Sequence, residues 1–196
     1  MDANGDKYDL DFTTHFENTA VQAEVVPAMP PAEKVVLDPQ FRIGTSKLEA
    51  EGYFVALARR GPGPAKQPGE CTIMLVEDEP VTNAVLQKVL SADGFTAHGA
   101  FDAAGLGKLL KQHGLPDLFM LDIELPKVSG LQILARIRKH PKLAAIPALI
   151  VTSKAEMSDV VRGLSLGANG YLSKPVTVES LRAVLRQILG GAPEKS

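Results

Sequence analysis

From residue 71 onward, short apolar runs alternate five times with segments in which apolar residues recur at helical spacing. Runs of this length predict strands, and the segments that follow them predict helices. The expected strands are 72–77, 95–100, 117–122, 147–152 and 170–173, and the expected helices are 80–94, 102–112, 129–140, 156–167 and 177–189. Five strand–helix units in succession are typical of an α/β domain built on a parallel sheet.

The first, third and fourth apolar runs lack polar alternation, as expected for strands that are covered by helices on both faces of the sheet. Right-handed crossovers then favour a flavodoxin-like, doubly wound sheet of five strands in the order 2-1-3-4-5. In the first helix, the spacing of Val81, Val85, Leu86, Val89 and Leu90 predicts one buried face.

The composition predicts a division of the chain near residue 60. Three Pro and three Gly lie between Gly61 and Gly69, which is typical of a linker. The first 34 residues contain seven acidic residues against two lysines and few apolar groups, which favours disorder. Residues 35–60 contain short β-branched stretches, and a unit of that size must pair with the rest of the chain or with a partner. The expected parts are a disordered acidic tail (1–34), a small β-rich extension (35–60), a linker (61–70), the α/β domain (71–190) and a tail (191–196).

The overall charge favours neither nucleic acid nor membrane as a partner. The chain has 21 basic and 23 acidic residues, a formal net charge of −2, and no apolar run long enough to cross a bilayer. Its one cysteine, Cys71, excludes an internal disulfide framework and is expected to be buried or at the linker's edge. With no signal-like N-terminus, we expect a cytoplasmic protein.

Charged residues gather where the expected strands end. Glu77 and Asp78 end the first strand, Asp122 ends the third, Thr152 ends the fourth, and Lys174 follows the fifth. Ligands bind at this edge of a doubly wound sheet, beside the point where the strand order reverses. Because the first and third strands are neighbours in the expected order, the three carboxylates should converge.

Three carboxylates that lie this close repel one another unless a cation is shared between them. Oxygen ligands with room for water favour Mg²⁺. With the ion bound, the Asp122 carboxylate could act as a nucleophile toward phosphorus. Lys174 would then supply a point charge, and Thr152 a hydroxyl, to the added phosphoryl group.

Four stretches, in this order, resemble the response-regulator receiver domain of two-component signalling: IMLVEDEP, LDIELPKVSG, IPALIVTSKAE and GANGYLSKPV. The resemblance covers about 120 of the 196 residues. It implies that Asp122 accepts a phosphoryl group from a sensor histidine kinase or a histidine phosphotransfer protein. It also implies that Glu77, Asp78, Asp122 and the carbonyl of Glu124 make up the Mg²⁺ site, with Glu77 acting through water.

The resemblance further implies a conformational switch. Thr152 would move toward the phosphoryl group while Tyr171 rotates inward, and Lys174 would precede a cis proline. These movements would remodel the face formed by the fourth helix, the fifth strand and the fifth helix. We expect a downstream protein to bind this face or the N-terminal extension, without direct contact to nucleic acid and with a homodimer as one assembly. Only GGAPEKS follows the last helix, so no DNA-binding output domain is expected after it.

Three other functions compete with the phosphoacceptor hypothesis. An aspartate-nucleophile phosphohydrolase would need a second Asp two residues after Asp122, where this chain has Glu124. A flavin-binding electron carrier would need a hydroxyl- and glycine-rich phosphate loop where this chain has EDEP. The alternative that stays open is a pseudo-receiver that binds proteins without being phosphorylated.

The remaining polar residues received structural interpretations. Asp102 and Ser129 are expected to be helix N-caps. His98, His113 and His140 are interpreted as surface or loop residues rather than metal ligands. The stretch RIRKH at 136–140 is interpreted as the solvated end of the third helix.

Overall fold

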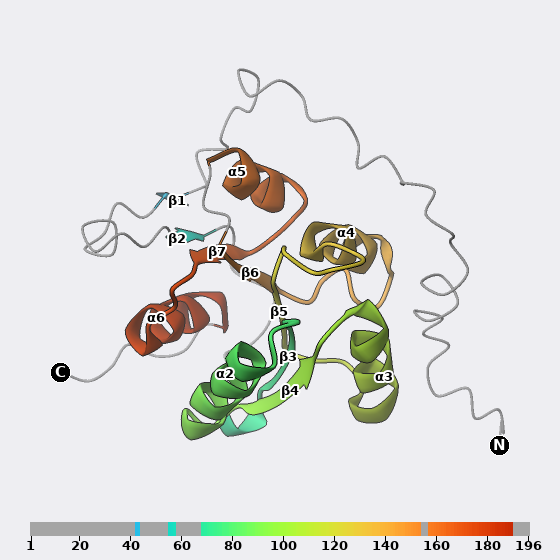
Figure 1. Ribbon diagram of the computed structural model, residues 1–196, viewed down its shortest axis with the longest axis vertical. Coiled ribbons are helices and arrows are strands. Elements are labelled where there is room, and N and C mark those ends of the chain that lie inside the picture. Colours follow the sequence, from blue (N-terminus) through green and yellow to red (C-terminus); the bar gives the residue numbers. More distant parts are fainter. Residues whose placement is uncertain (1–41, 44–54, 58–67, 154–156, 190–196) are drawn as a thin grey trace, which may run out of the picture.

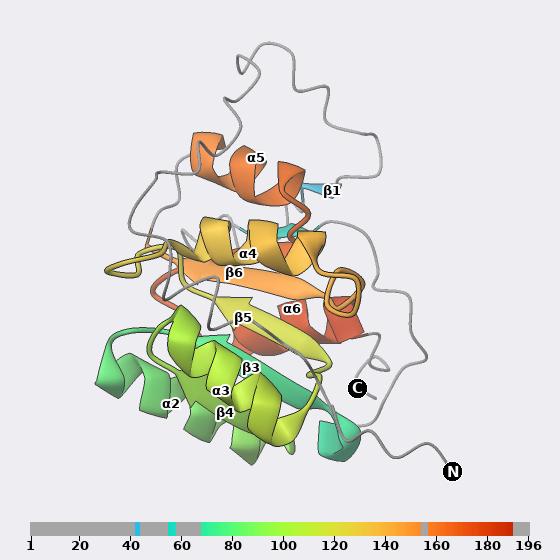
Figure 2. The same cartoon turned by 90° about the vertical axis from the view of Figure 1, so that its right-hand side faces the viewer.

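The computed structural model describes residues 42–43, 55–57, 68–153 and 157–189, and Figures 1 and 2 show them as one layered sheet with helices on both faces. Five parallel strands form most of the sheet, in the order β4-β3-β5-β6-β7, with β4 at one edge. They are β3 (Thr72–Val76), β4 (Thr96–Ala100), β5 (Leu118–Leu121), β6 (Ala148–Thr152) and β7 (Gly170–Ser173). This is the expected order 2-1-3-4-5, so the predicted fold class is confirmed.

Helices cover both faces of this sheet (Figure 2). They are α2 (Pro80–Ala92), α3 (Ala103–His113), α4 (Gly130–Lys139), α5 (Met157–Ser165) and α6 (Val178–Leu189). One apolar core joins α3, α4 and α5 to the sheet, and a second core joins α2 and α6 to the other face. Strands β3, β5 and β6 are buried almost throughout, which explains why their sequences lack polar alternation.

Asp102 and Ser129, the two residues expected to cap the N-termini of helices, do so. The Asp102 carboxylate accepts a hydrogen bond from the Gly105 amide at the start of α3. Ser129 forms a capping box with Gln132 at the start of α4, which satisfies otherwise unpaired amides at that end. The buried Cys71 lies directly before β3.

The predicted apolar face of α2 is partly wrong. Leu86 and Leu90 are buried, but Val81 is 68% exposed and Val85 is 53% exposed. The first inward position of the helix is taken by Asn83, which is buried. The reason lies in the tertiary structure: the helix begins over strand ends whose carbonyl groups need a donor, and an amide supplies one where a valine cannot.

The interpretation of residues 136–140 as a solvated helix end is wrong at Arg138. Its guanidinium group donates to the backbone oxygens of Ala144, Ile146 and Gly167 and to Oδ1 of Asn169. Desolvation by burial lowers the Arg138 pKa. The side chain therefore ties the end of α4 to the loops before β6 and β7, because a rigid guanidinium can bind several carbonyls at once.

The interpretation of the histidines as scattered surface or loop residues is incomplete. His98 lies within β4, and its ring stacks on that of His113, the last residue of α3, with centroids 3.8 Å apart. Burial and the nearby His113 lower the His98 pKa. The pair joins a strand to a helix that are adjacent along the chain.

Two short strands extend the sheet beyond β7. Strand β2 (Val55–Leu57) pairs antiparallel with β7, placing Ala56 opposite Tyr171, and β1 (Arg42–Ile43) pairs with β2. Both strands come from the predicted β-rich extension, which therefore pairs with the α/β domain. At the end of the predicted linker, residues Pro68–Glu70 form the short 3-10 helix η3. The expected tails at 1–34 and 191–196 lie outside the described residues, and the five-part division stays a prediction.

Candidate functional site

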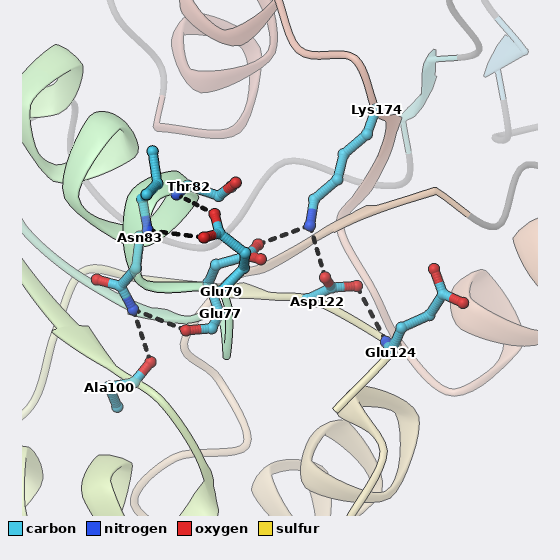
Figure 3. A network of polar contacts seen from close by, with 9 residues as sticks. Glu77, Glu79, Thr82, Asn83, Ala100, Asp122, Glu124 and Lys174 are labelled. Atoms are coloured by element: carbon cyan, nitrogen blue, oxygen red, sulfur yellow. Dashed lines mark hydrogen bonds and ion pairs between the residues drawn. The ribbon is translucent and has the colours of Figure 1, made fainter. Parts of the chain in front are cut away.

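The site lies where four strands end, and the sheet's own hydrogen bonds hold its backbone. The amide of Glu77 donates to the Ala100 oxygen at 3.0 Å, and the amide of Asp122 donates to the Val76 oxygen at 3.0 Å. The amide of Lys174 likewise donates to the Thr152 oxygen at 2.9 Å. The parallel pairing thus continues one residue past each strand. It brings together Glu77, Asp122 and Lys174, which are far apart in the sequence (Figure 3).

Three carboxylates converge at this edge. Ligand oxygens of Glu77, Asp78 and Asp122 all lie within 4.8 Å of one another. Glu77 and Asp122 are buried, whereas Asp78 is exposed. The structure therefore brings together three of the residues that the sequence suggested as metal ligands, with one side of the cluster open to solvent.

The ammonium group of Lys174 lies between the two buried carboxylates (Figure 3). Its Nζ is 2.7 Å from Glu77 Oε2 and 2.6 Å from Asp122 Oδ2. The lysine side chain is 20% exposed, while those of Glu77 and Asp122 are 4% and 5% exposed. A cation thus lies between the two buried carboxylates and offsets part of their charge.

Burial and pairing act in opposite directions on these groups. Burial raises the Glu77 pKa, helped by the nearby Asp122 and Asp78 charges, and Lys174 only partly offsets this. Burial also disfavours the charged form of Lys174, but its bonds to Asp122 and Glu77 outweigh burial and raise its pKa. A second cation at the cluster would relieve the remaining cost of ionising Glu77.

The turn after β5 holds Asp122 and leaves no room for a larger residue beside it. The Glu124 amide donates to Asp122 Oδ1 at 3.0 Å. At Gly130, the first residue of α4, a Cβ atom would come within 1.9 Å of the Asp122 carbonyl oxygen. Glycine at this position therefore lets α4 begin against the phosphoacceptor candidate.

The two remaining candidates, Thr152 and Tyr171, are buried in the sheet. Thr152 is the last residue of β6 and lies opposite Ser173 in the register with β7. Tyr171 belongs to the core on the α4 and α5 side, and a Cβ atom at Gly163 would lie 3.3 Å from its ring. Burial, with smaller effects from Asp159, Asp122 and Glu124, raises the Tyr171 pKa.

Two residues at the start of α2, the N-cap Glu79 and Asn83, adjoin the site, and no role was predicted for either of them. Glu79 caps the helix, accepting from the amides of Val81 and Thr82, ahead of Pro80 at the first helical position. Asn83 lies behind Glu77 and contacts its carbonyl oxygen. The helical spacing does indicate that Asn83 points inward. It lies three residues before Leu86 and seven before Leu90, which places it on the same face of the helix.

This donor set fits a hard divalent ion. Carboxylate oxygens that lie together, with solvent on one side, match the preference of Mg²⁺ for oxygen ligands and retained water. The ammonium group already seated between Glu77 and Asp122 indicates that the cluster requires positive charge. The acidic pocket is compatible with Mg²⁺.

Comparisons with known proteins agree with this geometry. A family model described as the response regulator receiver domain matches residues 73–186. The DNA-binding dual master transcriptional regulator RpaA of Synechocystis sp. is 34% identical over 117 residues, which are 60% of this chain and 48% of that protein. This chain spans about half the length of the curated relatives it matches.

Two solved structures share the fold. The signal receiver domain of a signal transduction histidine kinase from Syntrophus aciditrophicus has a TM-score of 0.56 and 25% identity, covering 64% of this chain and 95% of that one. The Mn²⁺-bound form of response regulator Rcp1 has a TM-score of 0.54 and 26% identity, covering 64% of this chain and 99% of that one. Among the described helices, none has the length and apolar character required to span a bilayer.

Proposed function

The chain belongs to the response regulator receiver domain family, and from this membership we propose that Asp122 is the phosphoacceptor of a two-component signalling switch. Receiver domains are phosphoacceptor modules rather than classical enzymes. The observation that supports this role most directly is the Lys174 ammonium group, seated 2.6 Å from Asp122 and 2.7 Å from Glu77. A lysine held there can pair with a phosphoryl oxygen as soon as one is attached.

The phosphoryl donor is a phosphohistidine on a sensor histidine kinase or a histidine phosphotransfer protein. A carboxylate oxygen of Asp122 attacks the phosphorus, and the P–N bond breaks with its electron pair staying on the histidine nitrogen. The new P–O bond creates an acyl phosphate. Water later cleaves this acyl phosphate to inorganic phosphate and the free carboxylate, which resets the switch.

Glu77, Asp78 and Asp122, with the backbone carbonyl of Glu124, would hold Mg²⁺. Support comes from the convergence of the three carboxylates within 4.8 Å and from the Mn²⁺-bound state named for Rcp1. When bound, the ion would neutralise negative charge that gathers between the carboxylates and the phosphoryl group. Lys174 would share that task, and the Thr152 hydroxyl would bind a phosphoryl oxygen.

The readout is a change of the surface formed by α5, β7 and α6. Thr152 and Tyr171 would act as the switch, since one ends β6 and the other lies in β7 against α5. A downstream protein would bind this face or the extension paired with it, and a homodimer could use the same face. We assign signalling to protein contacts in the cytoplasm rather than to contact with nucleic acid, although relatives are named as transcriptional regulators.

Phosphorylation of the intact protein tests the proposal. Wild type incubated with acetyl phosphate and Mg²⁺ should gain one phosphoryl group by intact mass, and the adduct should be lost on treatment with hydroxylamine. Asp122→Asn should gain none, and omission of Mg²⁺ should suppress labelling of the wild type. A folded wild type that stays unlabelled under these conditions would instead indicate the pseudo-receiver alternative.

A further inference from the structure

Behind the acidic cluster lies a buried amide that the phosphoryl chemistry does not use. Asn83, 1% exposed on α2, donates from Nδ2 to the Glu77 carbonyl oxygen at 2.9 Å and to the Ala100 carbonyl oxygen at 2.9 Å. Figure 3 shows these two bonds from Asn83. Because the Glu77 amide also donates to the Ala100 oxygen, the three residues form a closed ring of hydrogen bonds. The ring joins the ends of β3 and β4 to α2.

The orientation of the Asn83 amide is itself held from behind. Gln87, one turn later on α2, donates from Nε2 to Asn83 Oδ1 at 2.7 Å, which leaves Nδ2 facing the two carbonyls. The space is tight, because a Cβ atom at Gly99 would lie 2.1 Å from Asn83 Oδ1 and 2.4 Å from Gln87 Nε2. The lack of a side chain at Gly99, on β4, therefore leaves room for the Asn83 and Gln87 side chains of α2.

The peptide group anchored by Asn83 is the one that joins Glu77 to Asp78. The Asp78 side chain is exposed, so core packing does not hold it. Its direction depends instead on the backbone plane that Asn83 holds through the Glu77 carbonyl. A buried carbonyl that loses its donor also costs free energy, which favours a shift of this loop.

Resting on the proposed function, we propose that Asn83, oriented by Gln87, is a positioning residue that sets the geometry of the Glu77–Asp78 pair toward Mg²⁺. It touches neither the ion nor the phosphoryl group, and acts through the peptide between the two acidic residues. Loss of such an outer partner typically weakens metal binding by 10- to 100-fold. Asn83→Ala should therefore weaken Mg²⁺ binding by about tenfold or more.

The test measures Mg²⁺ affinity by calorimetry on the unphosphorylated full chain, alongside thermal stability and acetyl phosphate labelling. Asn83→Ala should raise the Mg²⁺ concentration at half-saturation. Saturating Mg²⁺ should restore most of the rate of acetyl phosphate labelling. Gln87→Leu should cause a smaller shift in the same direction, and this variant keeps the test usable if Asn83→Ala does not fold. Leu90→Val is the matched control, because it disturbs the core face of the same helix away from the acidic pair.

The outcomes separate this inference from the proposed function. If wild type binds Mg²⁺ and is labelled while Asn83→Ala and Gln87→Leu bind the ion as wild type does, the positioning role is refuted and the phosphoacceptor role stands. If Leu90→Val weakens Mg²⁺ binding as much as the amide variants at equal loss of stability, the effect is general and the positioning role is again refuted. If wild type neither binds Mg²⁺ nor is labelled, the proposed function itself fails.

Discussion

Lys174 shows how a single side chain can balance a site that carries excess negative charge. Its ammonium group contacts both buried carboxylates, at 2.7 Å and 2.6 Å, and its pKa is raised by those contacts against the effect of burial. A raised lysine pKa contributes stability that is present below the unfolded value of 10.5 and is lost as pH rises through the folded value. Throughout the neutral range, Lys174 is therefore a fixed charge.

Lys174→Met should lower the free energy of unfolding at pH 8 by about 2 kcal/mol, less than for a fully buried pair because the lysine is partly exposed. The loss should be smaller at pH 5. Burial already raises the pKa of Glu77, so its carboxyl group takes up a proton more readily at the lower pH. A carboxyl group whose pKa is raised by folding destabilises the fold increasingly as pH rises above the unfolded value of 4.5. Urea unfolding at the two pH values measures both effects.

The control for this prediction is Lys88→Met, since Lys88 is exposed on α2 and should be close to neutral at both pH values. An equal loss of stability at pH 5 and pH 8 for Lys174→Met would contradict the assigned charge coupling to Glu77.

At the scale of elements, the approach of α4 to the end of β5 is the closest fit in the site. Replacing Gly130 by Ala would place a Cβ atom 1.9 Å from the Asp122 carbonyl oxygen, so the helix or the turn must shift. Overpacking of this kind costs about 1–3 kcal/mol, and the shift should also slow acetyl phosphate labelling. Urea unfolding and the labelling rate check these two effects.

Gly69→Ala is the matched control, because no heavy atom lies within 4 Å of the added Cβ position in η3. It should leave both stability and labelling near wild type. If Gly130→Ala has the stability and labelling rate of the wild type, α4 can move away from β5 without loss of stability. The close approach of Gly130 to the Asp122 carbonyl would then not position Asp122.

Strand β2 changes the environment of β7, the strand that carries Tyr171. An isolated receiver sheet would leave β7 as an open edge, and exposed edges favour pairing with other chains. Here β2 pairs along β7 from Gly170 to Leu172, with Tyr171 opposite Ala56. A movement of β7 would therefore also act on residues 55–57, which precede the domain.

At the scale of the whole molecule, binding of Mg²⁺ should be linked to folding. Because the three carboxylates come from strand ends that meet only in the folded sheet, the ion should bind the folded chain and not the unfolded one. At 100 times its dissociation constant, Mg²⁺ should then raise the free energy of unfolding by about 2.7 kcal/mol. Thermal melts across a Mg²⁺ titration measure this gain.

Removal of Mg²⁺ with EDTA should abolish this gain in the free energy of unfolding. A sodium salt at equal ionic strength should not reproduce it. Asp122→Asn should lose most of the gain because one ligand carboxylate is removed. A melting temperature that does not respond to Mg²⁺ in the wild type would argue against a site shared by these carboxylates.

Residue order alone was enough to predict the layered architecture, the order of its five parallel strands and the set of charged residues at one edge. Those features depend on periodicity and on the rule that carboxyl ends of parallel strands meet, and both are local or topological properties. The caps at Asp102 and Ser129 were likewise readable, because capping involves residues only three apart.

Tertiary structure alone decided which polar groups meet. The Lys174 to Glu77 contact joins residues 97 apart, Asn83 binds Ala100 across 17 residues, and Arg138 reaches Asn169 across 31. The exposure of Val81 and Val85, where a buried face was predicted, and the partial burial of Arg138, where a solvated end was predicted, have the same origin. A buried carbonyl group needs a hydrogen-bond donor, and that donor can come from any part of the folded chain. The spacing of hydrophobic residues does not predict which residue supplies it.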